Sequence, residues 1–262
     1  MGIYWIISLS LTFVAIVEIM LSKNENTAHI RTWLYFIAVV VLFTFGGIRG
    51  LGTGLDDFQY RDFYAQFLDK IIIEGFWRAV VEFRYEPAIY AIAGATRVFT
   101  ANADIFIFVI AFIAVCVNAH YFRKLTPLPL VALAVYSAHL FINKDMNQIR
   151  FGLCSAFLLG FIWHMSRRSK SGMVTTFLLS FFCHATAVVA LLIPMAMIIR
   201  KNKYVPIAIV VISLPLAFMG SSALITALSS HLGSLGDRAM GYADAESRQE
   251  QGILTLSNLK NI

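Results

Sequence analysis

The stretch that decides the fold is residues 105–122, IFIFVIAFIAVCVNAHYF, which contains no Asp, Glu, Lys or Arg. A helix that crosses a membrane needs about 20 mostly apolar residues, so this run is typical of a membrane span. Further apolar runs occupy residues 3–21, 33–48, 128–142, 151–165, 173–199 and 205–232. The sequence therefore predicts an all-α fold, a polytopic membrane helix bundle that forms a single integral membrane domain over residues 1–262.

The composition supports the same fold class. Hydrophobic residues make up 59% of the 262 residues and charged residues only 14%, whereas a soluble domain carries about 25% charged residues. This composition excludes an aqueous enzyme, a nucleic-acid-binding domain and a disordered chain. The net charge of +6 does not indicate a nucleic-acid partner, because the basic residues form short clusters between apolar runs, as membrane topology requires.

Three segments do not have the pattern of a simple span. Residues 49–86 carry many acids and bases and cannot cross hydrocarbon, but their apolar residues recur every three or four positions, which predicts an interfacial amphipathic segment. Residues 87–99 are too short to cross and are expected to form a re-entrant segment. Residues 173–199 contain His184 near their middle, which predicts a helix broken into two halves.

Orientation follows from the basic clusters. The clusters that are expected to face the cytoplasm lie at 123–124, 167–170 and 200–203. The segments that are then expected to be extracytoplasmic are the outer loop 49–86, the loop 143–150 and the tail 236–262. The polar residues that are expected to line one cavity opening to that side are Arg49, Asp56, Asp57, Arg150 and His184.

Two candidate groups lie in the outer loop. Arg49 follows a glycine-rich helix end and is either an ordinary interfacial arginine or a planar cation that contacts a phosphate. Asp56 and Asp57 are solvated charges, ion-pair partners of Arg49 or Arg61, or a source of a catalytic base. Two adjacent carboxylates supply too few oxygens for a hard cation, so no metal site is predicted.

The remaining candidates mark helix ends. Arg150 follows Asn147 and Gln148 at the start of an apolar run. It is either an arginine that extends from a helix end to the interface or, because positive charge is disfavoured on the outer side, a group that binds an anionic ligand. His184 is either hydrogen-bonded to a neighbouring helix or a proton acceptor or phosphate contact in a wet cavity. Glu86 precedes a proline that starts a helix, and structural and functional interpretations of it are equally open.

Five short pieces occur in order within residues 40–200: GIRG (47–50), GLDDFQY (54–60), YEPAIY (85–90), MNQIRFGL (146–153) and FFCHATA (181–187). Their order and spacing resemble the EpsG-type polysaccharide polymerases, which are similar to the Wzy O-antigen polymerases. The chain departs from the family pattern at Ala88, Phe151 and Thr186, where glycine, glutamine and serine are common. It also ends soon after Asn258, whereas family members continue with further spanning helices, so a C-terminally truncated member is expected.

The resemblance implies a membrane glycosyltransferase in the bacterial cytoplasmic (inner) membrane. It would transfer a growing surface polysaccharide to a new repeat unit carried on undecaprenyl diphosphate, on the extracytoplasmic side and without a cofactor. The positions that match as catalytic are Arg49, Asp56, Arg150 and His184. The residues expected to bind substrate are Asp57, Glu86, Asn147 and Gln148. Besides the lipid-linked glycan and membrane lipid, a chain-length regulator and a flippase are the expected partners.

Three other functions fit the same charge pattern. A flippase or exporter of a lipid-linked glycan also needs outer arginines and a polar residue within the membrane. A ligase that moves finished glycan to another acceptor has nearly the same requirements. A non-catalytic membrane subunit of glycan assembly is the remaining alternative.

Overall fold

The computed structural model describes residues 2–50, 54, 56–83, 85–199 and 211 of the chain. These residues form helices and connecting turns, with no strand among them, which confirms the predicted all-α class. The chain divides into two units, residues 1–191 and 192–262. The second contains α10 (Leu192–Ile199). The predicted tail 236–262 lies outside the described residues, as does the apolar run 205–232 apart from residue 211.

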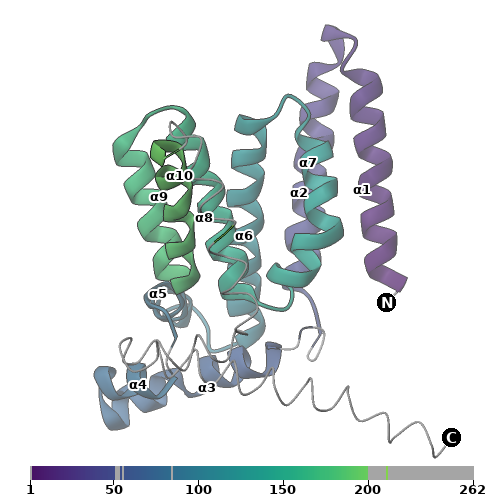
Figure 1. Ribbon diagram of the computed structural model, residues 1–262. Helices are drawn as coiled ribbons and strands as arrows, with labels where there is room; N and C mark the ends of the chain where they lie inside the picture. Colours follow the sequence, from purple (N-terminus) through teal and green to yellow (C-terminus); the bar gives the residue numbers. More distant parts are fainter. Residues whose placement is uncertain (1, 51–53, 55, 84, 200–210, 212–262) are drawn as a thin grey trace, which may run out of the picture. The chain divides into compact units, whose positions relative to one another are not determined.

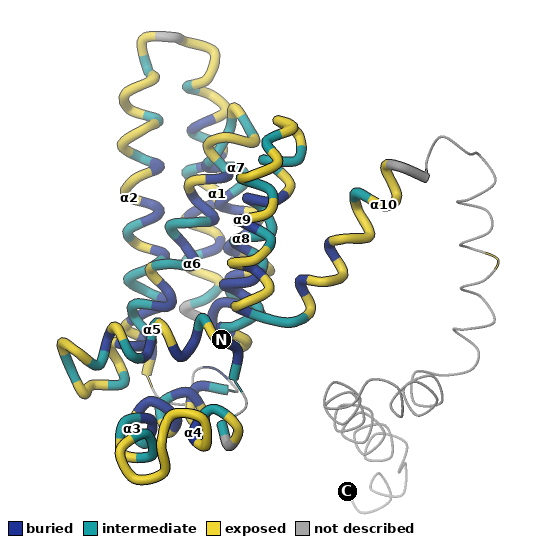
Figure 2. Tube along the Cα trace, turned by 90° about the vertical axis from the view of Figure 1, so that its left-hand side faces the viewer, coloured by how far each residue is buried: buried dark blue, intermediate teal, exposed yellow. Residues whose placement is uncertain are grey.

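Four helices of the first unit are long and apolar enough to cross a membrane. They are α1 (Gly2–Leu21), α2 (Ala28–Gly47), α6 (Ala103–Leu125) and α8 (Ile149–Ser166). A 3₁₀ turn (Glu25–Thr27) connects α1 to α2. Exposed positions run along the outer side of α2 (Figure 2), where Trp33 and Phe36 are 66% and 58% exposed. Large apolar side chains at such positions are suited to contact with lipid rather than water.

The predicted span 128–142 has a different form in the structure. The helix α7 (Pro129–Tyr136) continues as a π-helical segment (Ser137–Asp145). The Tyr136 hydroxyl donates a hydrogen bond to Asp145 Oδ2 at 2.7 Å. π-Helical turns are rare and frequently mark functional sites. Here the wider turns end with a buried Asp145, whose backbone carbonyl accepts a hydrogen bond from Arg49.

The predicted amphipathic segment is two helices, α3 (Asp57–Glu74) and α4 (Phe76–Phe83), which lie across one end of the bundle (Figure 1). They are separated at Gly75, whose φ of 86° is a conformation that favours glycine. The α3 side chains Phe63 and Phe67 are buried in the core, whereas Ile72 on α3 and Trp77 on α4 are 78% and 77% exposed. One face therefore packs on the bundle and the other presents apolar side chains, as an interfacial helix pair does.

Two shorter helices complete the first unit. The segment predicted to be re-entrant contains α5 (Pro87–Arg97), which packs on α6 and α9. The helix α9 (Lys170–Cys183) packs on α8, and Ser180 Oγ donates a hydrogen bond to the Cys154 carbonyl at 2.9 Å. His184 has extended dihedral angles (φ −162°, ψ 131°) and is followed by a 3₁₀ segment (Ala185–Leu191). The helix is thus broken at the predicted histidine.

The two ends of this unit differ in charge. The turns at 22–27, 126–128 and 167–169 lie together at one end (Figure 1), with basic residues in or beside each of them; we call this the basic end. The helices α3 and α4 and the start of α8 lie at the opposite end. Arg150 and His184 are therefore at the same end of the bundle, as the arrangement of basic clusters predicted.

The close approach of α8 to the π-helical segment gives a first testable expectation. A Cβ at Gly152 would lie 2.5 Å from Asp145 Oδ1 and 3.0 Å from Asp145 Cα. We expect Gly152→Ala to lower the free energy of unfolding by about 1–3 kcal/mol, as overpacking does. Gly94→Ala on α5 is the control, because no atom lies within 4 Å of its Cβ and alanine is the better helix former. Equal thermal stability of the two variants in detergent would contradict the contact.

Candidate functional site

The centre of the candidate site is the Arg150 guanidinium. Its Nη1 donates to Glu86 Oε2 at 2.7 Å and its Nε donates to the Tyr60 hydroxyl at 2.9 Å. The guanidinium carbon also lies 4.9 Å from the centroid of the Tyr85 ring. These contacts bring together the start of α8, the residue before α5 and the first turn of α3. With Asp56, we call these five residues the Arg150 cluster.

Local sequence explains how these side chains are placed. Gln148 is the N-cap residue of α8, so Arg150 projects from the first helical turn. Pro87 occupies the first turn of α5, where its fixed φ suits a helix start, and Glu86 is the N-cap residue before it. Tyr60 lies one turn into α3, four residues after Asp56. Arg150, Glu86 and Tyr60 therefore each lie at or within one turn of the start of a helix.

Burial and neighbouring charges shift the pKa values of the cluster members, including Asp56 and Tyr60. Burial raises the pKa of Asp56, and the nearby Arg150 charge opposes that rise. Burial also raises the pKa of Tyr60 to about 12. The Tyr60 hydroxyl therefore keeps its proton at neutral pH while its oxygen accepts from Arg150. A half-buried carboxyl beside a fixed cation has the properties of a group that exchanges protons with a ligand.

Arg49 forms a separate buried group beside this cluster. Its Nη2 lies 2.6 Å from Asp57 Oδ1, and both side chains are 1% exposed. Its Nη1 donates to the Asp145 carbonyl at 2.9 Å, and the Gly54 N–H donates to Asp57 Oδ2 at 3.1 Å. Of the two adjacent aspartates, Asp57 is thus the ion-pair partner of Arg49. The anionic group that the glycine-rich segment contacts, through the Gly54 N–H, is therefore the Asp57 carboxylate.

His184 is connected to α8 by an aromatic contact. Its ring is 5.8 Å from the Phe151 ring, in an edge-to-face arrangement. The Thr186 backbone N–H donates to His184 Nδ1 at 3.2 Å. Lys144 places its ammonium 4.5 Å from the centroid of the same Phe151 ring. Phe151, the residue after Arg150, therefore contacts both the His184 imidazole and the Lys144 ammonium.

The other two predicted substrate-binding residues have protein contacts. The Asn147 side chain donates to the Ile142 carbonyl at 2.9 Å. Gln148 Oε1 accepts from Lys144 Nζ at 2.8 Å. Both lie in the turn before α8, so they are close in sequence to Arg150. Their part in binding a substrate stays a prediction.

Sequence reasoning gave no role to Tyr60, Tyr85, Lys144 or Asp145. Tyr60 is one helical turn from Asp56, so it shares a helix face with that aspartate. Lys144 is a basic residue in a loop predicted to be extracytoplasmic, as Arg150 is, and could have been found by the same topological argument. No local pattern marks Asp145 or Tyr85, since their contacts depend on distant elements.

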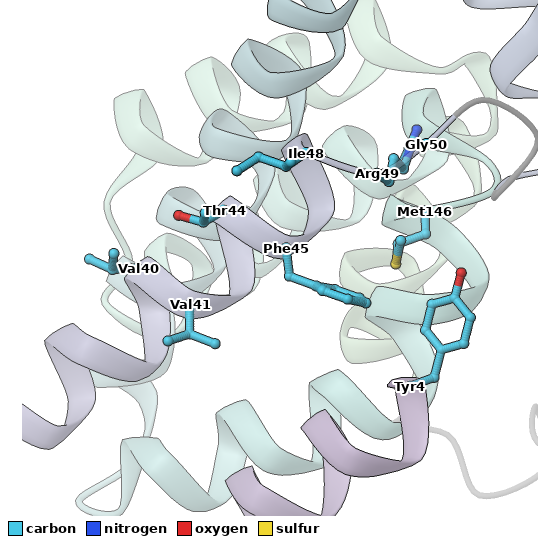
Figure 3. A pocket seen from close by; sticks show the side chains of 9 residues that line it. All are labelled: Tyr4, Val40, Val41, Thr44, Phe45, Ile48, Arg49, Gly50 and Met146. Carbon is cyan, nitrogen blue, oxygen red and sulfur yellow. The ribbon is translucent and has the colours of Figure 1, made fainter. Parts of the chain in front are cut away.

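An apolar cavity of about 660 Å³ adjoins Arg49. It is lined mainly by α2 side chains and by Tyr4 of α1, with Arg49, Gly50 and Met146 at one side (Figure 3). Tyr4 and Phe45 meet edge to face with ring centroids 5.8 Å apart, and Figure 3 shows Met146 pointing toward them. A hydrocarbon chain fits the chemistry of this lining.

The model of the family described as "EpsG family" matches residues 32–262. The chain belongs to the EpsG family. This EpsG-family chain is 36% identical over 265 residues to the Amylovoran biosynthesis protein AmsC of Erwinia amylovora, an alignment that covers 100% of the chain and 71% of that relative. No solved structure matches it. Family and relative together support a role in exopolysaccharide assembly by a membrane protein.

Proposed function

We propose that this EpsG-family protein polymerises polysaccharide repeat units carried on undecaprenyl diphosphate. The supporting observation is the Arg150 cluster, in which a cation and two carboxylates from separate helices meet at the end opposite the basic loops. Since basic loops face the cytoplasm, this end is extracytoplasmic in a bacterial inner membrane. A chain-length regulator and a flippase are then the expected protein partners.

Arg150 is the group proposed to stabilise the diphosphate leaving group. The side chain is 20% exposed, compared with 1% for Arg49. A guanidinium has five N–H donors, so contacts to Tyr60 and Glu86 leave others for phosphate oxygens. Lys144 adds a second cation near Phe151. Fixed donors aimed at a developing negative charge are an effective form of transition-state stabilisation.

Asp56 is the group proposed as the general base. The Thr186 N–H donates to His184 Nδ1, so this nitrogen already has a partner, and we assign the base to Asp56 instead. Asp56 is a half-buried carboxyl with a raised pKa. In the proposed step Asp56 takes the proton of the acceptor hydroxyl, whose oxygen attacks the anomeric carbon. The bond from that carbon to the diphosphate breaks, and the electron pair leaves with the phosphate oxygen.

Arg49 and Asp57 are proposed to position the site rather than touch the substrate. Their ion pair connects the end of α2 to the start of α3, and Arg49 also holds the Asp145 carbonyl. Asp56 directly precedes Asp57, so this pair fixes the backbone that carries the proposed base. The apolar cavity between α1 and α2 would hold part of the isoprenoid chain of the carrier.

The products of the purified full chain test this proposal. The protein is reconstituted with an undecaprenyl-diphosphate-linked repeat unit, and products are separated by gel and weighed by mass spectrometry. A ladder of increasing chain length with release of undecaprenyl diphosphate supports a polymerase. Transfer to a different acceptor without a ladder would indicate a ligase, and movement of the substrate across vesicles without chain growth would indicate a flippase. Either result would overturn the proposal.

The pH dependence of the same reaction tests the base. Asp56 must be ionised to accept a proton, so activity is expected to fall as the pH drops through its folded-state pKa. Burial raises that pKa, so the acid limb is expected above about pH 4, the usual range for aspartate. Asp56→Asn should remove the acid limb together with most activity. Asp62→Asn, on the helix that Asp56 precedes, is the control. A profile unchanged in Asp56→Asn would exclude Asp56 as the base.

A further inference from the structure

The basic end of the first unit contains two adjoining cavities, far from the Arg150 cluster. A polar cavity of about 230 Å³ is lined by residues that include Glu18, Arg31 and Thr126. An apolar cavity of about 510 Å³ is lined by α2 and α6 residues that include Phe36 and Cys116. The two share Thr32, Tyr35 and Arg123 in their linings. The two cavities therefore adjoin at these three residues, and we treat them together as a hollow with a polar and an apolar part.

The polar part carries an excess of positive charge, because two arginines and one glutamate line it. Glu18 Oε2 accepts hydrogen bonds from the backbone N–H groups of Leu130 at 2.9 Å and Val131 at 3.1 Å. This carboxylate therefore stabilises the N-terminus of α7. Arg31 Nε is buried and has no hydrogen-bond partner in the part of the chain that the structure describes. Arg123 forms no ion pair with any described residue. Two guanidinium groups thus share this cavity with a single carboxylate, Glu18, whose Oε2 already accepts two backbone hydrogen bonds from α7.

The apolar part faces the surroundings of the bundle. Trp33 and Phe36 on α2 line it and are 66% and 58% exposed. Tyr35 closes its inner side, where its hydroxyl donates to the Ala119 carbonyl of α6 at 2.7 Å. The groove therefore runs along α2 and α6 on the surface that hydrocarbon would cover. Its polar end coincides with Arg123 in the last turn of α6.

We propose that this hollow binds an anionic phospholipid of the cytoplasmic leaflet. The phosphate contacts Arg31 and Arg123, and one acyl chain lies in the groove between α2 and α6. A guanidinium matches phosphate geometry through paired N–H donors, and anionic lipids accumulate in the cytoplasmic leaflet. The site lies at the end opposite the Arg150 cluster and does not depend on the proposed polymerase activity.

Lipid binding to the purified full chain in detergent tests this site. The probes are dioleoylphosphatidylglycerol, dioleoylphosphatidylcholine and glycerophosphoglycerol, the last being the headgroup without chains, and native mass spectrometry gives apparent dissociation constants. Phosphatidylglycerol is expected to bind most tightly. Arg31→Gln/Arg123→Gln is expected to weaken its binding at least about tenfold, because charge-assisted hydrogen bonds are lost. Lys23→Gln/Lys170→Gln removes two exposed cations from the same end and is expected to change binding less than about twofold.

Two further variants keep the test decisive. Arg123→Gln alone changes an exposed side chain and is expected to weaken binding even if the double variant does not fold. Cys116→Phe fills the groove and is expected to weaken phosphatidylglycerol binding without affecting the free headgroup. The proposal is overturned if the headgroup alone binds as tightly as the lipid. Equal loss in the Lys23/Lys170 control, or equal binding of the two lipids, would overturn it as well.

Discussion

Arg150→Ala is expected to lower the rate of polymer formation by about 10²- to 10³-fold, the loss typical when a fixed donor to a developing oxyanion is removed. The substitution removes the donors to Tyr60 and Glu86 together with the charge proposed to face the diphosphate. Arg150→Lys keeps a charge but cannot make the paired planar contacts, so an intermediate loss is expected. The measurement is the initial rate of chain growth on the lipid-linked unit at fixed protein concentration.

Two controls separate catalysis from structure in this experiment. Arg97→Ala removes a cation from the same end that donates to the Ala101 carbonyl and contacts no member of the Arg150 cluster; its rate is expected to stay within a few-fold of wild type. Glu86→Ala/Arg150→Ala removes the ion pair as a whole and is expected to recover thermal stability but not polymerisation. Recovered chain growth in the double variant would show that Arg150 serves only to pair with Glu86.

Asp57→Ala is expected to lower the free energy of unfolding by about 3–5 kcal/mol, because it leaves the buried Arg49 charge without its partner. Asp56→Ala, one residue earlier, is expected to change it by less than about 1 kcal/mol, since Asp56 forms no ion pair with any described residue. The two neighbouring aspartates should thus differ clearly in how much their substitution lowers the free energy of unfolding. Unfolding of each variant in detergent, followed against temperature or denaturant, gives its free energy of unfolding. The rate of chain growth is measured on the same preparations.

A paired substitution refines this result. Arg49→Met/Asp57→Leu replaces the buried ion pair with apolar groups and is expected to recover most of the stability lost in Asp57→Ala. If Arg49 positions the site, the paired variant should keep measurable chain growth. Complete loss of chain growth with full stability would instead place Arg49 in contact with the substrate, as the sequence resemblance implied.

Much of the architecture was predictable from sequence because a membrane imposes it. Apolar runs of sufficient length predicted the spans now seen as α1, α2, α6 and α8, and the break at His184 followed from a polar residue within an apolar run. The positions of the basic clusters predicted that Arg150 and His184 share one end. These features depend on the free-energy cost of placing charges and unpaired backbone groups in hydrocarbon. That cost depends on the residue types within each segment, so it can be read from the sequence.

The pairing of the charged groups was decided only by the tertiary structure. Apart from the family resemblance, the sequence could not tell whether Asp56 or Asp57 pairs with Arg49, because the partner of each depends on how distant helices pack. Because α3 lies across the end of the bundle, Asp57 forms an ion pair with Arg49, and Asp56 lies near Arg150. The π-helical segment that brings Asp145 to Arg49 had no local signal. Burial and ion pairing arise from contacts between distant elements, and these exist only once the helices have packed.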